Sequence, residues 1–513
     1  MSIIGSHSVV NDSTRARANS HRSLPLWFHA IFAAAAGLAL RLFLVLRFPA
    51  DAGDSAMYEE LAHNWADRHI YGLFRGQALV PTDIRAPGYP AFLALLYHYI
   101  GRSIPLIALA QALIDLGTCF LVAALASRLI APPPGEKNPP QRRRIWLAAL
   151  WLAATCPFVA NYAAVPLTEV LATFLTAAAL LAMVAGCGDI ADIPRGASGR
   201  EWHAWFLAGL LAGLGALVRP EAPLVVLALA AVLGFRWRHR ADWGKLLRAG
   251  AFVVLGLLLP LLPWAARNWI TLHRVQFLAP RYATTPEEYI TRGFNAWTHT
   301  WLVRYRHVYL VSWNIDSAPV LLDDIPPSAF DSGDERARVS SLLDQYNETL
   351  TLTPALDAGF AQLARERTAR HPLRTYLSVP LQRALTLWFT PRVDLLPFSG
   401  HILPLGRQWR RDAVDVGVTL LLGAFNFFYV ILAAVGWWRL RRSAPSKQVP
   451  VAAWLLLAFI LLRTAFFTTV ETPEPRYVLE CFPALLALGA ATWLRSPASF
   501  PGSPAARDEW SRG

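Results

Sequence analysis

Long blocks of apolar residues, almost unbroken by charge, recur along most of this chain. Overall, 55% of the 513 residues are hydrophobic and 16% are charged. A soluble domain of this size needs far more polar surface to cover its core. Because the blocks are continuous and do not alternate as in a half-buried strand, they indicate helices that cross a bilayer. We therefore predict an all-α integral membrane protein.

The blocks can be assigned to about ten transmembrane helices, several of them close to the lower length limit for crossing a bilayer. The sixth, Ala222–Phe235, is short. The expected spans are Leu24–Leu46, Ile104–Ile130, Ile145–Val159, Pro166–Gly186, Trp202–Val218, Ala222–Phe235, Ala249–Trp264, Val414–Trp438, Val449–Phe467 and Tyr477–Leu494.

Arginine clusters test this count, because cytoplasmic connections are rich in Lys and Arg. If the N-terminus is cytoplasmic, every second connection is cytoplasmic, and each of these carries a cluster. Joining the fifth and sixth spans would put one cluster on the wrong side, so we keep them separate. Topology also explains the formal net charge of +13 better than nucleic-acid binding, which is not expected. The clusters lie at 142–144, 195–200, 236–248 and 439–447.

The spans divide the chain into five parts. Cytoplasmic tails are expected at 1–23 and 496–513, with an N-terminal transmembrane module at 24–266 and C-terminal transmembrane helices at 412–495. The first outer loop, 47–103, contains two amphipathic stretches of the kind that lie along a membrane surface, Ala56–Ile70 and Pro90–Ile100. The segment 267–411 is long enough to fold as a mixed cap outside the membrane, with helix-like stretches at Asp334–Tyr346 and Leu356–Arg370.

No cofactor motif is present. The four cysteines lack CxxC spacing, and the histidines lack ligand spacing. Walker A, dinucleotide-binding and Ser-His-Asp patterns are absent, so nucleotide-driven chemistry is not expected. No cofactor is therefore predicted, and a divalent metal is compatible with the chain but not required.

Acidic and arginine side chains recur together at the outer ends of the spans, on the side where arginine is otherwise scarce. A charge near the centre of a bilayer is costly, so such residues are usually paired, solvated or functional. Each residue taken singly could simply mark the membrane interface at a helix end. Their recurrence together indicates a polar cavity that is open to the outer leaflet. The residues are Asp51, Asp54, Asp83, Arg85, Glu169, Arg219, Glu221, Arg267, Glu471, Glu474 and Arg476.

The first motif follows the first span. Asp54 and Tyr58 are one helical turn apart, so both can face one site, and Asp51 lies three residues earlier. A carboxylate held at the membrane surface can accept a proton from a hydroxyl if it stays ionised. Asp54 could instead cap the helix that follows, and spacing alone leaves both roles open.

The second motif is Asp83-Ile-Arg85-Ala-Pro-Gly-Tyr-Pro90. Its prolines and glycine predict a rigid turn that fixes the direction of Arg85. A guanidinium offers a planar fork of donors that suits phosphate. Arg85 could also serve only as an interfacial anchor. Four further proline-marked turns carry charge at the ends of spans: Pro166-Leu-Thr-Glu169, Arg219-Pro-Glu221, Pro263-Trp-Ala-Ala-Arg267-Asn268 and Glu474-Pro-Arg476-Tyr477.

In chain order, these motifs resemble the GT-C superfamily of polytopic membrane glycosyltransferases, in the branch with protein O-mannosyltransferases and the lipid A aminoarabinose transferase. The resemblance extends from about Arg41 to Pro483. It rests on Asp54 with Tyr58, Arg85-Ala-Pro-Gly-Tyr-Pro, Pro-Leu-Thr-Glu169, Leu-Val-Arg219-Pro-Glu, Pro-Trp-Ala-Ala-Arg267-Asn and Arg476-Tyr477.

The resemblance implies an inverting transfer of a hexosyl or pentosyl group from a polyprenyl-phosphate donor at the periplasmic face of a bacterial inner membrane. The module at 24–266 would be catalytic, and the acceptor would be a glycolipid, a polysaccharide or a protein. By residue, it implies a catalytic base at Asp54 or Asp51, donor-phosphate binding by Arg85, Arg267 and Arg476, and sugar or acceptor binding by Tyr58, Asp83, Glu169, Arg219 and Glu221.

The chain departs from the family pattern at the base position. Members of the branch often carry adjacent acids, whereas here Ser55 follows Asp54, so the base is open between Asp54 and Asp51. The alternative function is a transporter or flippase of a lipid-linked sugar, with the same charges along its path. Such proteins commonly show inverted repeats, and no internal repeat is present here.

Overall fold

A computed structural model describes residues 25–50, 52–130, 139–191, 201–237, 243–282, 289–443 and 449–494. Over these ranges the chain is helical except for its loops, its turns and one two-stranded hairpin. A helix or helical turn lies at each apolar block. These are α1 (Leu26–Arg47), α4 (Ile104–Ser127), α5 (Pro140–Ala154), α6 (Pro157–Ala160), α7 (Glu169–Ala191), α8 (Glu201–Val218), α9 (Leu224–Trp237), α10 (Trp243–Leu272), α17 (Ala413–Ser443), α18 (Val451–Phe467) and α19 (Phe482–Ala490).

Among the described residues, five helices are long and apolar enough to cross a membrane: α1, α4, α7, α10 and α17. A sixth span would consist of α5 followed by Pro157–Ala164, which is α6 with the 3-10 turn that continues it; the two parts are bent by 46° relative to each other. The helices α8, α9 and α18 are apolar but shorter. The chain is thus a multi-pass membrane protein, whereas the count of about ten spans stays a prediction.

Large apolar side chains are exposed on α17 of the bundle and on a helix outside the bundle, between residues 289 and 411. On α17, Leu421 and Phe428 are about half exposed, and on α15 (Val379–Phe389) so are Leu381 and Leu385. Extended apolar surfaces of this kind mark contact with lipid.

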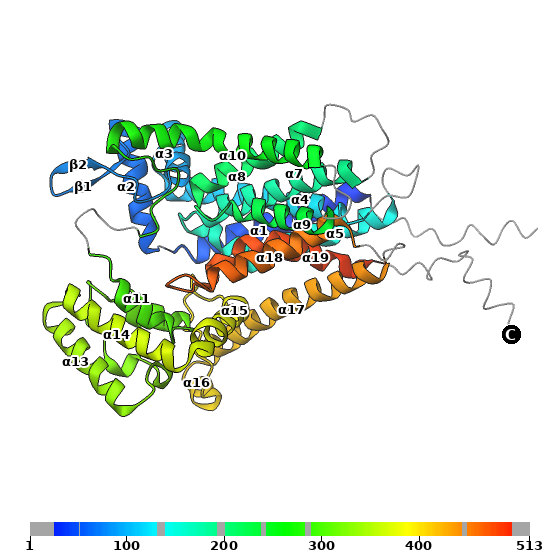
Figure 1. Cartoon of the computed structure of the whole chain (residues 1–513). Helices are drawn as coiled ribbons and strands as arrows, with labels where there is room; N and C mark the ends of the chain where they lie inside the picture. The colour runs from blue at the N-terminus through cyan, green and yellow to red at the C-terminus, as the bar shows by residue number, and fades with distance from the viewer. Residues whose placement is uncertain are drawn as a thin grey trace, which may run out of the picture.

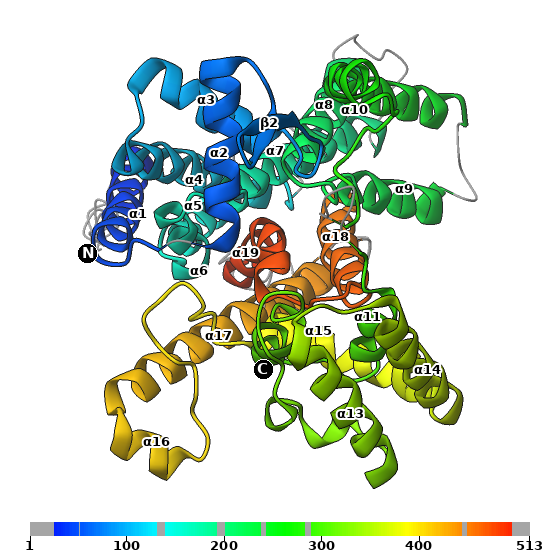
Figure 2. The same ribbon diagram turned by 90° about the vertical axis from the view of Figure 1, so that its left-hand side faces the viewer.

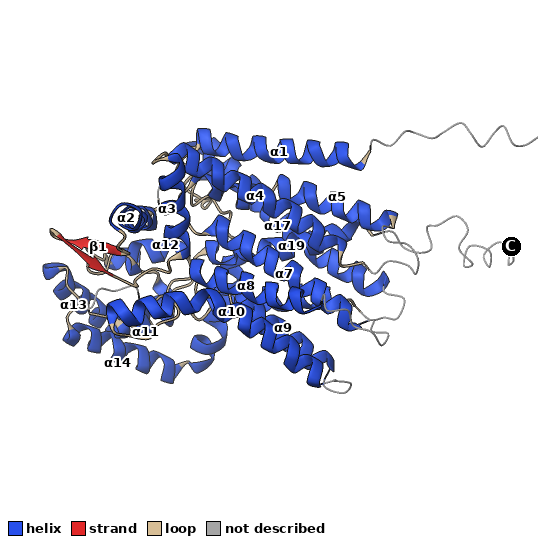
Figure 3. Ribbon diagram, turned by 90° about the horizontal axis from the view of Figure 1, so that it is seen from above, coloured by secondary structure: helices blue, strands red, loops and turns tan. Residues whose placement is uncertain are grey.

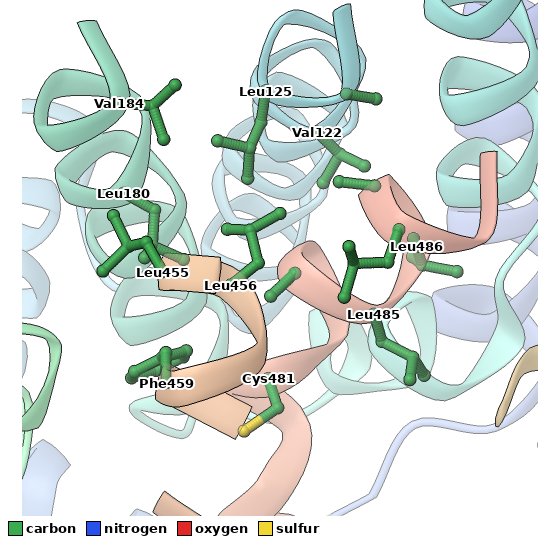
Figure 4. Close-up of a cluster of buried hydrophobic side chains, with 14 of the residues drawn as sticks. Val122, Leu125, Leu180, Val184, Leu455, Leu456, Phe459, Cys481, Leu485 and Leu486 are labelled. Carbon is green, nitrogen blue, oxygen red and sulfur yellow. The ribbon is translucent and has the colours of Figure 1, made fainter. Parts of the chain in front are cut away.

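Inside the bundle, α4, α7, α18 and α19 meet around a cluster of aliphatic side chains (Figure 4). Small residues allow closer approach between α8 and α10. A Cβ on Gly209 would lie 2.0 Å from the carbonyl oxygen of Val253, and one on Gly213 would lie 2.4 Å from that of Leu257. These two glycines form a GxxxG pair, which brings helix backbones into contact in membranes.

The first outer loop contains two helices and a hairpin. The two expected amphipathic stretches are α2 (Gly53–Arg68) and α3 (Gly88–Ile100). Between them lies an antiparallel hairpin of β1 (Gly72–Arg75) and β2 (Ala78–Pro81), which the sequence analysis did not predict. Each strand has only four residues, too few for a clear alternation.

Residues 289–411 form a helical cap with its own core, in which Phe294, Trp297, Tyr346 and Phe360 are almost fully buried. Both helix-like stretches expected here are helices. The cap helices are α11 (Arg292–His299), α12 (Tyr305–His307), α13 (Gly333–Thr349), α14 (Pro354–Arg370), α15, and α16 (Leu405–Arg411). Helical turns lie at Val308–Ser312, Leu322–Asp324, Pro327–Ala329 and Arg374–Ser378.

The cap and the first-loop elements lie at the same end of the helix bundle (Figures 1 and 3). The arginine-bearing first turn of α5 and last turn of α17 lie at the opposite end. Figure 2 looks onto the cap end, where α19 lies between α2 and the cap helices. Helix ends from distant parts of the sequence therefore converge at one end of the bundle.

Candidate active site

A chain of ion pairs connects separate segments at the cap end. At its outermost point, the carboxylate of Asp54 accepts hydrogen bonds from two arginines. Nη2 of Arg85 lies 2.8 Å from Oδ1, and Nη2 of Arg476 lies 3.3 Å from Oδ2. The side chains of Asp54, Arg85 and Arg476 are 28%, 22% and 19% exposed. This part of the chain of ion pairs is therefore within reach of a ligand.

The ion pairs continue inward from Arg476. Its Nε donates to Glu474 at 2.6 Å, and its Nη1 lies 3.6 Å from Oε1 of Glu169. Arg219 donates to the same Glu169 oxygen at 3.0 Å and to Glu221 at 2.8 Å. Because Glu169 is bound by Arg219 and lies close to Arg476, it fixes the distance between these two guanidinium groups.

The innermost members lie between α18 and the 3-10 turn Pro475–Cys481. Arg463, fully buried, lies 2.5 Å from Glu480 and 3.4 Å from Glu221. Glu480 also accepts a hydrogen bond from Thr176 at 3.1 Å. We call this chain of ion pairs the outer charge cluster. It consists of Arg85, Arg219, Arg463 and Arg476 with Asp54, Glu169, Glu221, Glu474 and Glu480, one carboxylate more than guanidinium groups.

Local sequence positions the outermost residues. Asp54 lies in the first turn of α2, where the helix dipole favours an acid, but the N-cap residue is Ala52. The capping role considered for Asp54 is therefore wrong. A Cβ on Gly88 would lie 2.6 Å from the carbonyl oxygen of Leu217, so only glycine lets the start of α3 rest on α8. This contact anchors the turn that carries Arg85. Asp51 lies outside the described residues.

A cavity of about 480 Å³ opens beside Asp54 and Arg476. Part of its wall belongs to the membrane module, including Tyr162 and Leu167, and part belongs to the cap. Its lining residues are Ala52, Gly53, Asp54, Tyr162, Leu167, Tyr305, Tyr309, Trp313, Asp394, Leu395, Pro475 and Arg476. A cavity with few charged groups and several aromatic side chains is typical of a ligand site.

Two carboxyl groups line this cavity in different electrostatic environments. Burial by itself would raise the pKa of Asp54, but Arg85 and Arg476 outweigh it and hold the pKa below its ordinary value. Burial raises the pKa of Asp394, against the opposing effect of Arg392. Burial, followed by the nearby Asp54 charge, raises the pKa of Tyr58 to about 12. Asp54 is therefore ionised at neutral pH, while Tyr58 keeps its proton.

Two predicted site residues lie apart from the outer charge cluster. Arg267 donates to the carbonyl oxygens of Tyr71 and Thr82, at 2.7 and 2.8 Å, and so holds the base of the hairpin. Asp83 is buried, with Arg274 at 3.7 Å as its ion-pair partner. Tyr58 lies closer to the cluster and packs edge-on against Tyr89. The structure thus brings together Asp54, Arg85, Glu169, Arg219, Glu221 and Arg476, but not Arg267 or Asp83.

The sequence analysis did not identify Glu480 or Asp394. Glu480 falls within an expected span, and a carboxylate in an apolar block is itself a signal that it omitted. Asp394 lies in the cap segment, where no apolar pattern indicates depth. Among the described residues, no group of three or more His, Cys, Asp and Glu side chains is arranged to hold a metal ion.

No protein-family model matches the chain, and no curated protein matches it. Solved structures do align with most of the chain. The archaeal oligosaccharyltransferase AglB from Archaeoglobus fulgidus, in complex with an inhibitory peptide and a dolichol-phosphate, aligns with 92% of this chain at 12% identity and a TM-score of 0.48. An Archaeoglobus fulgidus oligosaccharyltransferase in the apo form aligns with 91% of this chain at 13% identity and a TM-score of 0.47.

Both of these structural neighbours are archaeal oligosaccharyltransferases. The chain spans about half the length of each of the two, since the alignments cover 50% of either archaeal chain.

Proposed function

We propose that this protein is an inverting glycosyltransferase that moves a sugar from a polyprenyl-phosphate donor to an envelope acceptor. The observation that carries the proposal is an ionised carboxylate, Asp54, held between two arginines at the edge of a cavity. A carboxylate can serve as a general base, and the arginines suit a phosphate.

The reaction assigns one task to each outermost residue. An acceptor hydroxyl attacks the anomeric carbon from the face opposite the phosphate, and Asp54 takes its proton. The new bond joins acceptor oxygen to carbon while the carbon–oxygen bond to phosphate breaks, so the configuration inverts. The departing phosphate gains a second negative charge, which Arg85 and Arg476 stabilise because they are already in place.

Glu169, Arg219 and Glu221 lie deeper, and their charged atoms are engaged with one another. We therefore assign them to positioning Arg476, in place of direct contact with sugar or acceptor. Arg463 and Glu480 hold the inner end of the same arrangement.

The proposed site lies on the periplasmic side of a bacterial inner membrane. The support is the position of the arginine-bearing ends of α5 and α17, opposite the outer charge cluster, together with the preference of arginine for the cytoplasmic side.

A direct test incubates the purified protein in detergent with a set of polyprenyl-phosphate sugars and measures release of the free polyprenyl phosphate. The proposal expects release with at least one donor when an envelope extract supplies the acceptor. A flippase would instead move a donor across reconstituted vesicles and leave its sugar–phosphate bond intact, and that result would overturn the proposal.

The pH dependence of transfer follows from the charges around Asp54. Its lowered pKa keeps the base deprotonated to a lower pH than an ordinary aspartate. In Arg85→Gln one cation is lost while burial remains, so the pKa rises and the acidic limb of the pH–rate profile moves to higher pH. The matched variant Arg102→Gln, at an exposed arginine of the same loop, leaves the limb in place. A limb that stays in place in Arg85→Gln contradicts the assignment.

A further inference from the structure

A stripe of three aromatic side chains forms the cap side of the cavity beside Asp54. Tyr305, Tyr309 and Trp313 follow one another at four-residue spacing and all line this cavity. The ring centroids of Tyr309 and Trp313 are 4.4 Å apart, and those of Tyr305 and Tyr309 are 4.9 Å apart. The hydroxyl of Tyr305 donates to that of Tyr309 at 3.2 Å.

The stripe is held in place by the cap core, against which Tyr305 packs, while its other two side chains are exposed. Val308 and Val311, on the other face of the same helical segment, are fully buried in that core. By contrast, Tyr309 is 48% exposed and Trp313 is 40% exposed. Two large aromatic side chains are therefore presented to the cavity by a segment that is anchored from behind, so little ordering is needed when a ligand binds.

The same cavity is also lined by charged groups. Asp54 and Arg476 come from outside the cap, and Asp394 comes from the cap itself. A lipid chain in the cavity would leave these charged groups unsatisfied. A sugar ring matches both the aromatic and the charged groups, because it has a C–H face of slightly positive character and a rim of hydroxyls. The C–H face suits the electron-rich face of an aromatic ring, and the hydroxyls suit the carboxylates and the guanidinium group.

We propose that Tyr309 and Trp313 form the platform on which a saccharide acceptor stacks, so that the acceptor is a carbohydrate of a glycolipid or polysaccharide. The acceptor role rests on the proposed function, whereas binding of a sugar ring to the platform does not. The donor arrives from the membrane, and the cap presents the platform from the water side. The hydroxyl that attacks would thus lie between the platform and Asp54.

Saturation-transfer NMR on the purified full-length protein tests this inference. The probes are millimolar methyl glycosides of glucose, galactose, mannose and N-acetylglucosamine, with a short serine- and threonine-containing peptide in parallel. We expect transfer to the ring C–H protons of at least one glycoside. Trp313→Ala and Tyr309→Ala should each reduce it at least fivefold, Trp313→Phe should retain most of it, and Trp409→Ala, at an exposed tryptophan of α16, should leave it unchanged.

Size-exclusion chromatography of each variant checks that a variant without the glycoside signal is still folded. The inference is overturned if no glycoside receives saturation, if only the peptide does, or if both alanine variants bind glycosides as the wild type does. The donor-release assay on the wild-type protein separates this inference from the proposed function. A wild-type protein that binds glycosides but consumes no donor overturns the function and keeps the platform.

Discussion

Asp54→Asn is expected to lower sugar transfer by about 100- to 10,000-fold, the range by which a positioned base contributes. Asparagine keeps the shape of the side chain and can still accept from one arginine, but it cannot take the acceptor proton. The measurement is the initial rate of polyprenyl phosphate release. Expression, membrane insertion and the size-exclusion profile should match the wild type, because the side chain lies at the edge of a cavity and not in the core.

Asp67→Asn is the matched control, since Asp67 lies on the same helix, is half exposed and pairs with Arg102. It should transfer at the wild-type rate. Asp51→Asn is the third variant. If it loses sugar transfer while Asp54→Asn stays active, the base is Asp51. Full activity in both variants removes the base from this segment altogether.

Arg41→Met is expected to destabilise the fold by about 3–5 kcal/mol, the range found when one partner of a buried ion pair is removed. Arg41 and Asp115 are 0% and 1% exposed, and their charged atoms are 2.7 Å apart. Arg41 also donates to the carbonyl oxygens of Gly37 and Ala154, at 2.9 and 3.0 Å. One guanidinium thus joins α1, α4 and α5, and without it the carboxylate of Asp115 is stranded in the bundle.

Thermal unfolding in detergent measures this effect. The double variant Arg41→Met/Asp115→Leu should recover much of the lost stability, because neither charge then remains buried alone. Arg102→Met removes the exposed partner of Asp67 and should cost less than about 1 kcal/mol. A double variant that is as unstable as Arg41→Met would show that the two residues do not act as a pair.

The sequence predicts well which helix ends lie together, because apolar blocks and arginine clusters indicate the direction of each helix. This is why Asp54, Arg85, Glu169, Arg219 and Arg476 could be placed together at one end of the bundle. Asp54 and Arg476 are 422 positions apart in the chain, yet they share a hydrogen bond.

Lateral position is set by how helices pack, and hydropathy carries no information about it. Arg267 lies near the C-terminal end of α10, at the cap end, but the packing of α10 directs its guanidinium to the hairpin. Tyr309 and Asp394 come from the cap, where the sequence gives neither depth nor direction. The 3-10 turn Pro475–Cys481, which brings Glu480 to Arg463, has no periodic pattern of its own.

The charges around Asp54 also predict how tightly the protein binds a polyprenyl phosphate that carries no sugar. In the outer charge cluster carboxylates outnumber guanidinium groups by one, so a phosphate must compete with Asp54 for Arg85 and Arg476. Arg85→Ala removes one phosphate ligand and should weaken binding of a sugar-free polyprenyl phosphate about tenfold, or roughly 1.4 kcal/mol. Arg102→Ala should leave the affinity unchanged.

The most direct measurement is the affinity of Asp54→Asn for the same polyprenyl phosphate, determined by calorimetric titration in detergent. If Asp54, Arg85 and Arg476 form one site, the variant binds the phosphate more tightly than the wild type even though it no longer transfers sugar, because the negative charge that competes for the two arginines is gone. An affinity equal to or weaker than that of the wild type would contradict a shared site.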